Sequence, residues 1–144
     1  MTRRLLGVLA SAALVLAVGA GCDEDSDSGA GSTTTYTLSG NLIKSGVSGV
    51  RGYLKLVAPG APSTSAPKYW TSSTVFSNGT ATYTFSGVAT GSYDGYAFID
   101  MNGSSAGGAS AFPDAGDWTA GPGEITITGN QVQNVQEDDW ELYN

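Results

Sequence analysis

The chain contains no histidine and only one cysteine among its 144 residues. Without histidine, Ser-His-Asp and Cys-His nucleophilic sites, His-ligated zinc and histidine general bases are excluded. The sequence also has no Walker-type phosphate loop and no GxGxxG between a strand and a helix. We therefore predict a protein that is not an enzyme. A small hydrolase with paired carboxylates, as in glycoside hydrolysis, is the catalytic alternative.

Basic residues are also scarce, with six Lys and Arg against 13 Asp and Glu, for a net charge of −7. Two of the six, Arg3 and Arg4, lie in the first few residues. Without them the net charge is −9, because only Lys44, Arg51, Lys55 and Lys68 oppose the acidic residues. This balance argues against nucleic acid as a partner and against electrostatic binding to anionic lipid headgroups.

The N-terminal segment is "MTRRLLGVLASAALVLAVGAGC". Arg3 and Arg4 precede an uncharged, mostly apolar run over Leu5–Ala20, and small residues at 19–21 lead to Cys22. A basic start, a short apolar run and small residues before a cleavage point are typical of a secretory signal. The apolar run is slightly short for a membrane-spanning helix, which needs about 17–25 residues.

The position of the single cysteine makes this segment similar to the signal of bacterial lipoproteins. The resemblance implies a signal peptide over residues 1–21 and a lipidated Cys22, acylated for example with palmitate, as the first mature residue. It also implies anchoring in the bacterial cell envelope, on the periplasmic or outer-membrane side. More than one acyl chain holds a protein durably on a membrane. An ordinary signal cleaved elsewhere is the alternative.

Residues 22–34 continue from the cysteine with "DEDSDSGAGSTT". Acidic segments rich in Ser and Gly bury no apolar surface that could offset their ordering entropy. We predict a disordered tether over 22–34 and one folded domain over 35–144, a length typical of a single domain.

The folded part is predicted to be all-β, because short runs alternate apolar and polar residues between turn signals. In Thr80–Phe85 the alternation is strict, and Asn78-Gly79 before it is typical of a tight hairpin turn. About seven such runs predict a single antiparallel β-sandwich or barrel. The other runs lie around Tyr36, Tyr53–Val57, Lys68–Phe76, Ser92–Ile99, Glu124–Thr128 and Val132–Tyr143, the last broken near Gln136. The expected core is Leu42, Leu54, Leu56, Phe76, Tyr83, Phe85, Val88, Tyr96, Phe98, Ile125, Ile127 and Trp140.

The stretch "YTFSGVATGSYDGYAFIDMNG" resembles the transthyretin-like (prealbumin-like) β-sandwiches and the B-type repeats of bacterial adhesins. In those families an aromatic strand meets a GV-x-x-G-x-Y corner, here Gly87–Tyr93, and the next strand ends in a D-x-N loop. The resemblance implies a seven-stranded Greek-key β-sandwich. Gly91 permits the turn of the corner, and Val88 and Tyr93 are expected to pack on the core.

The loop "DMNGSSAGGASAFPDAGD" is a candidate calcium site. Asp100, Asn102 and Ser104 match the first three alternating ligand positions of a calcium loop, and Asp114 and Asp117 keep the spacing of positions nine and twelve. About six extra residues separate the two halves. We predict a weak, structural calcium site made by these five residues. The alternative is a connection whose side chains cap its own turns.

The aromatic residues are the remaining candidates for binding. Trp70, Trp118 and Trp140 could form a sugar-stacking platform, although core packing is the more common use of such residues. Trp118, beside the acidic loop, is the one expected to be exposed. We therefore predict a non-catalytic binding or structural module of the cell envelope, with a carbohydrate-binding module as the alternative. The expected partners are the membrane, through Cys22, and an envelope protein or a glycan.

Overall fold

The computed structural model describes residues 33–71, 74–105, 107 and 110–144. The predicted signal peptide, Cys22 and most of the predicted tether therefore lie outside the described residues. Within the described part of the chain, no helix is long and apolar enough to cross a membrane.

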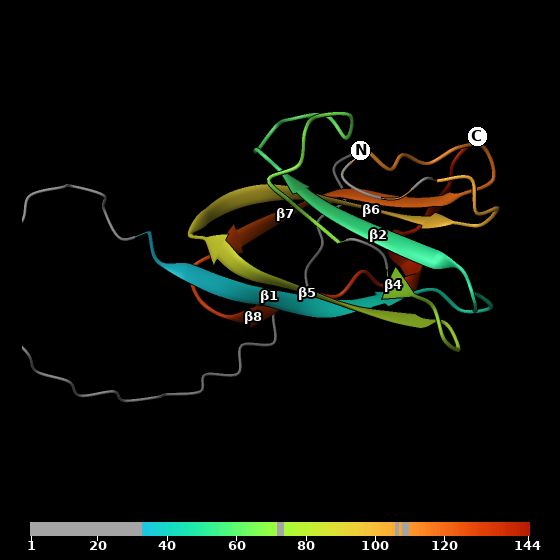
Figure 1. Ribbon diagram of the computed structural model, residues 1–144, viewed down its shortest axis with the longest axis horizontal. Helices are drawn as coiled ribbons and strands as arrows, with labels where there is room; N and C mark the ends of the chain where they lie inside the picture. Colours follow the sequence, from blue (N-terminus) through green and yellow to red (C-terminus); the bar gives the residue numbers. More distant parts are fainter. Residues whose placement is uncertain (1–32, 72–73, 106, 108–109) are drawn as a thin grey trace, which may run out of the picture.

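The described residues form an all-β structure of two stacked sheets, which confirms the predicted fold class (Figure 1). Five strands have seven residues or more: β1 (Thr35–Ile43), β2 (Arg51–Val57), β5 (Thr80–Ala89), β6 (Gly91–Asp100) and β7 (Trp118–Ile127). Four have two residues: β3 (Tyr69–Trp70), β4 (Thr74–Val75), β8 (Gln131–Val132) and β9 (Glu141–Leu142). A 3₁₀ turn, η1 (Glu137–Asp139), precedes β9.

The smaller sheet has the order β5-β1-β8, and the larger has the order β3-β2-β6-β7-β9, with β4 also pairing with β2. The strand count and direction differ from the seven antiparallel strands expected. The runs predicted over Lys68–Phe76 and Val132–Tyr143 each form two short strands. In addition, β8 pairs with β1 in parallel, with Leu38 opposite Gln131. The later run breaks where predicted, because Gln136 and Asp139 cap each other's backbone at η1.

The main core lies between the two sheets. Of the twelve residues predicted for it, ten are buried there: Leu42, Leu54, Leu56, Phe76, Tyr83, Phe85, Val88, Ile125, Ile127 and Trp140. Side chains alternate along β6, and its inward positions are Tyr93, Gly95, Ala97 and Ile99. The prediction for Tyr96 was therefore wrong, because this side chain points to the opposite face and is only partly buried.

The outer face of the larger sheet carries a second, smaller core. It consists of Tyr53, Phe98 and Ala111, with the rings of Tyr53 and Phe98 stacked at 4.6 Å between centroids. Phe98 is buried as predicted, but in this cluster and not between the sheets. Since Ala111 lies in the connection from β6 to β7, that connection covers part of the outer face.

The two turns singled out in the sequence both form. Asn78 and Gly79 have positive φ angles of 50° and 80°, as a tight turn requires. They close a tight turn in which Ser77 and Thr80 pair antiparallel, but the strands on either side do not form a longer hairpin, since β4 pairs with β2 and β5 pairs with β1. At the Gly87–Tyr93 corner, Val88 and Tyr93 pack on the core as expected. Both turns carry the chain from one sheet to the other.

The strand register assigns each connection to one end of the sandwich. Thr35 pairs with Ala89, and Gly91 pairs with Ile127, so the start of β1 lies at one end. Asp100 pairs with Arg51 at the other end. Figure 1 shows the start of β1 on the left and the 101–117 connection on the right, near the C-terminus.

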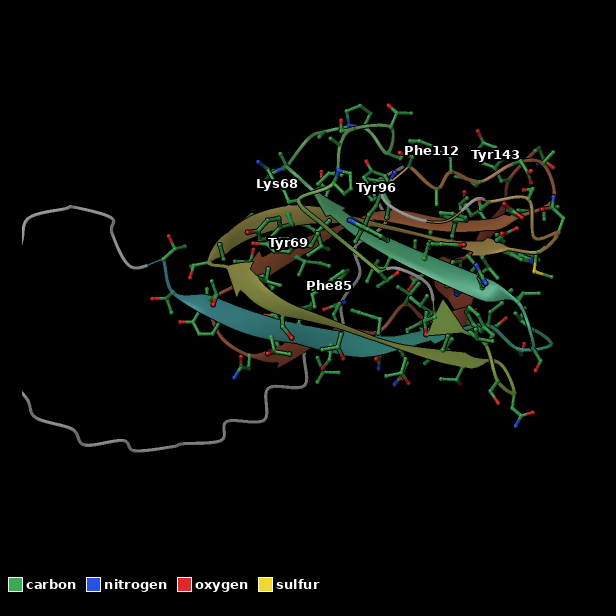
Figure 2. All side chains as sticks on the ribbon, viewed as in Figure 1. Lys68, Tyr69, Phe85, Tyr96, Phe112 and Tyr143 are labelled. Atoms are coloured by element: carbon green, nitrogen blue, oxygen red, sulfur yellow. The ribbon has the colours of Figure 1, made fainter. Side chains whose placement is uncertain are left out.

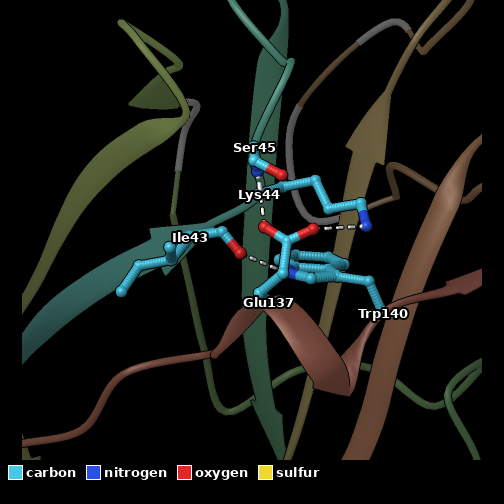
Figure 3. Close-up of polar contacts among 5 residues, drawn as sticks. All are labelled: Ile43, Lys44, Ser45, Glu137 and Trp140. Atoms are coloured by element: carbon cyan, nitrogen blue, oxygen red, sulfur yellow. Dashed lines mark hydrogen bonds and ion pairs between the residues drawn. The ribbon is translucent and has the colours of Figure 1, made fainter.

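The C-terminal segment is bound to the end of β1 (Figure 3). Glu137 accepts hydrogen bonds from the ammonium of Lys44 at 2.8 Å and from the backbone N–H of Ser45 at 2.5 Å. The indole N–H of Trp140 donates to the carbonyl of Ile43 at 2.8 Å. Glu137 therefore binds the C-terminal segment to the end of β1.

Candidate functional site

The acidic loop connects β6 to β7 and begins where Asp100 ends β6. All five predicted metal ligands take part in one hydrogen-bonded network in this loop: Asp100, Asn102, Ser104, Asp114 and Asp117. The five residues therefore belong to one network, whose contacts are hydrogen bonds within the protein. Their present hydrogen-bond partners are groups of the protein itself.

Asp100 is buried and fixes the first half of the loop. Its Oδ1 accepts the backbone N–H groups of Gly103 at 2.8 Å and Ser104 at 3.1 Å, and its Oδ2 accepts that of Ser105 at 3.2 Å. A carboxylate that accepts several backbone N–H groups satisfies donors that a turn would otherwise leave unpaired. The Asn102 side-chain oxygen also accepts the N–H of Ser104, at 2.8 Å.

Asp117 is completely buried and joins the two halves of the loop. Its Oδ1 accepts the backbone N–H of Met101 at 2.9 Å, and its Oδ2 accepts that of Asp114 at 3.0 Å. The backbone at Asp117 also accepts the N–H of Tyr143 at 2.8 Å. Asp117 therefore connects the end of β6, the loop and the C-terminal strand.

Asp114 differs from the other two aspartates because its carboxylate accepts side-chain donors. Its Oδ1 accepts the amide of Asn102 at 2.8 Å, and its Oδ2 accepts the hydroxyl of Ser104 at 2.5 Å. These two hydrogen bonds hold the pKa of Asp114 below its usual value, and the hydrogen bond from Ser104 has the larger effect. Side chains can rotate away more easily than backbone groups, so this carboxylate can exchange its partners.

The donor set has the chemistry that calcium prefers, since it consists of carboxylate, amide and hydroxyl oxygens. In the described part of the chain, however, no three acidic or cysteine side chains are arranged around a common point that could hold a metal ion. The loop is thus structured by backbone hydrogen bonds to Asp100 and Asp117. Calcium binding would require Asp114 and Asn102 to exchange their mutual hydrogen bond for the ion. The predicted lipidation site, Cys22, lies outside the described residues.

The three tryptophans lie in different environments. Trp140 is buried in the core, as its alternation with Leu142 indicated. Trp118 is half-buried, with the ammonium of Lys44 at 4.1 Å from the centroid of its ring. Trp70 is the most exposed of the three, at 40%. The expectation of an exposed Trp118 was therefore wrong, because this side chain packs against the main core and the Lys44 ammonium lies over its ring.

Two polar residues of β2, Tyr53 and Lys55, were not among the predicted functional residues. Tyr53 and Lys55 are both buried on the outer face of the larger sheet. Lys55 alternates with Leu54 and Leu56, which face the main core. A signal was nevertheless present in the sequence, because Tyr53 and Val57 flank Lys55 on the same face and are apolar or aromatic.

Comparison of the chain with models of known protein families, with characterised proteins and with solved structures found no match. The function must therefore be argued from the residues and their geometry.

Proposed function

We propose that this protein is a non-catalytic lipoprotein of the bacterial cell envelope whose β-sandwich serves as a binding or structural module. The observation that carries the proposal is the position of the two ends of the sandwich. The segment after the proposed anchor, Cys22, leads into β1 at one end, and the acidic loop lies at the other end. An anchored domain of this kind would present the acidic loop away from the membrane.

The use of the aspartates supports a structural role for the loop. Asp100 and Asp117 are buried and accept five backbone N–H groups between them. A general acid or base must instead reach a substrate proton. A cavity between the sheets, lined among others by Leu54, Tyr83 and Ile125, has a volume of about 30 Å³. That is room for one or two water molecules.

For the finer fold class, we propose the transthyretin-like β-sandwich. The Gly87–Tyr93 corner supports this class, because it passes the chain from β5 in one sheet to β6 in the other and buries Val88 and Tyr93. The D-x-N loop follows directly after β6, as in those families. The strand count and the parallel pairing of β8 are features in which this chain would differ.

The loop is also where we propose that calcium binds, with Asp100, Asn102, Ser104, Asp114 and Asp117 as ligands. Asp114 supports this assignment, since its oxygens are bound only to side chains that an ion could displace. Sites in extracellular modules bind calcium with dissociation constants of about 10⁻⁴–10⁻³ M.

A thermal melt with calcium and with chelator tests this proposal. We expect millimolar calcium to raise the melting temperature of the wild type in a saturable way. Asp100→Ala and Asp114→Ala should both abolish the rise. Asp114→Ala should change the melting temperature in chelator only slightly, because it releases no backbone donor. An unchanged rise in both variants, or no rise in the wild type, would remove calcium from the proposal.

The alternative is a carbohydrate-binding module that uses exposed aromatic residues. Trp70, and not Trp118, favours this alternative, because 40% of its surface is exposed. A glycan array probed with the wild type, Trp70→Ala and Trp118→Ala separates the two tryptophans. Binding that is lost only in Trp70→Ala would support the alternative, and binding to no glycan would reject it.

A further inference from the structure

Two buried donors on the outer face of the larger sheet have no acceptor among the residues that the structure describes. Among the described residues, the hydroxyl of Tyr53 and the ammonium of Lys55 are the buried side-chain polar atoms without a hydrogen-bond partner. The exposed fractions of these residues are 4% and 8%. Buried polar groups are nearly always hydrogen-bonded, so two unpaired donors on one strand face call for an explanation.

Aromatic rings surround Lys55. In the strand register it lies opposite Trp70 of β3 on one side and Tyr96 of β6 on the other. Residues directly opposite in a sheet project from the same face. The ring of Phe112, from the acidic loop, lies over the ammonium, with its centroid at 4.4 Å. Figure 2 shows Tyr96 and Phe112 on the outer side of the larger sheet, away from Tyr69 and Phe85 between the sheets.

The aromatic contact compensates the buried charge only in part. A desolvated cation is attracted to the face of an aromatic ring, but by less than the cost of removing an ammonium from water. Burial accordingly lowers the pKa of Lys55 from its usual value. A ligand that brought a negative charge to the ammonium would remove this imbalance.

We propose that Lys55 and Tyr53 form a binding site for a single carboxylate carried on a ring-shaped small molecule. Lys55 supplies the positive charge, the Tyr53 hydroxyl donates a hydrogen bond, and Trp70 and Phe112 contact the face of the ring. A monoanion suits the site because the chain has a net charge of −7, which repels polyanions. The site involves neither the lipid anchor nor the calcium ligands, so it goes beyond the function proposed above.

A ligand would reach the ammonium past Phe112, the ring that lies over it. Phe112 is 41% exposed and Trp70 is 40% exposed, so both rings border solvent. The Phe112 ring can rotate outward without opening the core between the sheets. Tyr53 remains fixed by its stacking on Phe98.

Titration calorimetry on the full chain in detergent tests the site. The probes are glucuronate, an acidic sugar, and benzoate, an aromatic acid, with glucose and benzamide as their neutral counterparts. Chelator is present throughout, so that calcium binding cannot contribute and the two proposals fail separately. We expect at least one acid to bind at millimolar concentration, and its neutral counterpart not to bind.

Three variants assign the binding to this site. Lys55→Met should weaken it about tenfold or more, the size expected for losing a hydrogen bond to a charged group. Lys68→Met removes an exposed lysine and should leave the affinity unchanged. Tyr53→Phe keeps the stacked ring and should weaken binding severalfold, which tests the site even if Lys55→Met fails to fold.

Each outcome of these measurements either identifies the class of ligand or rejects the proposed site. Binding of glucuronate alone identifies a sugar acid as the ligand class, and binding of benzoate alone identifies an aromatic acid. Failure of both acids to bind at 25 °C would overturn the proposal. Equal affinity of the wild type and a folded Lys55→Met or Tyr53→Phe variant would overturn it as well.

Discussion

At the scale of single residues, burial separates the aspartates of the acidic loop into two kinds. Asp117 is completely buried and accepts two backbone N–H groups, whereas Asp114 accepts only side-chain donors. The sequence pattern that predicted the loop could not distinguish them, because it records residue type and spacing only. The positions of the backbone donors depend on how the insert folds.

Replacing Asp117 should destabilise the fold whether or not calcium is present. Asp117→Ala leaves the partly buried N–H groups of Met101 and Asp114 without their acceptor, at a cost of up to about 1–3 kcal/mol each. We expect a loss of about 2–5 kcal/mol in the free energy of unfolding, measured by urea denaturation in chelator. Asp114→Ala is the matched control and should lose far less. Equal losses in the two variants would contradict this assignment.

Glu137 should make stability depend on pH in the acidic range. The pKa of Glu137 is lowered below its usual 4.5. The hydrogen bond from Lys44 has the largest effect, and the hydrogen bond from Ser45 the next largest. Because the folded state binds this proton less readily than the unfolded state, the stabilisation is present above pH 4.5 and is lost as the pH falls through the lowered pKa.

A Glu137→Gln variant checks this contribution. Melting temperatures between pH 7 and pH 3 should fall less steeply for the variant than for the wild type, and the two should converge at the acidic end. Asp138→Asn is the control, because Asp138 is an exposed neighbour. A variant curve parallel to that of the wild type would show that Glu137 contributes nothing.

At the scale of strands, the sequence predicted which segments form strands better than it predicted which strands pair with one another. The alternation of residue types identified β5 and β6, because side chains along these strands point by turns into the core and away from it. The pairing of β4 with β2, instead of β5, could not be predicted, because an Asn-Gly turn fits both a hairpin and a crossing between sheets. In β6 the inward positions include Gly95 and Ala97, and the larger Tyr96 and Phe98 point outward. A prediction from side-chain size therefore placed Tyr96 and Phe98 in the main core, although both side chains point to the outer face.

The contact between β1 and the C-terminal segment depends on a glycine. A Cβ atom on Gly40 would lie 1.7 Å from the carbonyl oxygen of Gln133. The same oxygen accepts a hydrogen bond from the Tyr83 hydroxyl at 2.6 Å, and the Gln133 N–H donates to Ser39 at 2.9 Å. Any side chain at position 40 must push the segment after β8 away from β1.

Gly40→Ala should therefore strongly destabilise the domain, by more than the typical 1 kcal/mol of a point substitution. Gly46→Ala serves as a control for backbone strain, because Gly46 has a φ angle of 75° but no atom within 4 Å of the Cβ position. Hydrogen exchange should show faster exchange of the Gln133 and Val135 amides in Gly40→Ala. Similar exchange rates in Gly40→Ala and the wild type would contradict the role of this contact.

At the scale of the whole molecule, the start of β1 and the acidic loop lie at opposite ends of the sandwich, and the proposed tether precedes β1. The fold class could be predicted from the turn spacing and the alternation of apolar and polar residues. The absence of histidine excluded histidine-dependent catalysis and histidine-ligated zinc. The Lys55 face could not be predicted, because it depends on the acidic loop folding back over the sheet. The lipid anchor rests on the sequence around Cys22 alone.

The most direct test of the central proposal is intact-mass spectrometry of the full-length protein expressed in a bacterium and extracted from its membrane fraction. The account predicts a chain that begins at Cys22 and carries the added mass of a diacylglycerol and an acyl chain. Cys22→Ser should leave the membrane fraction. A wild-type chain that begins at another residue, or that carries no lipid, would contradict the proposal of an anchored envelope module.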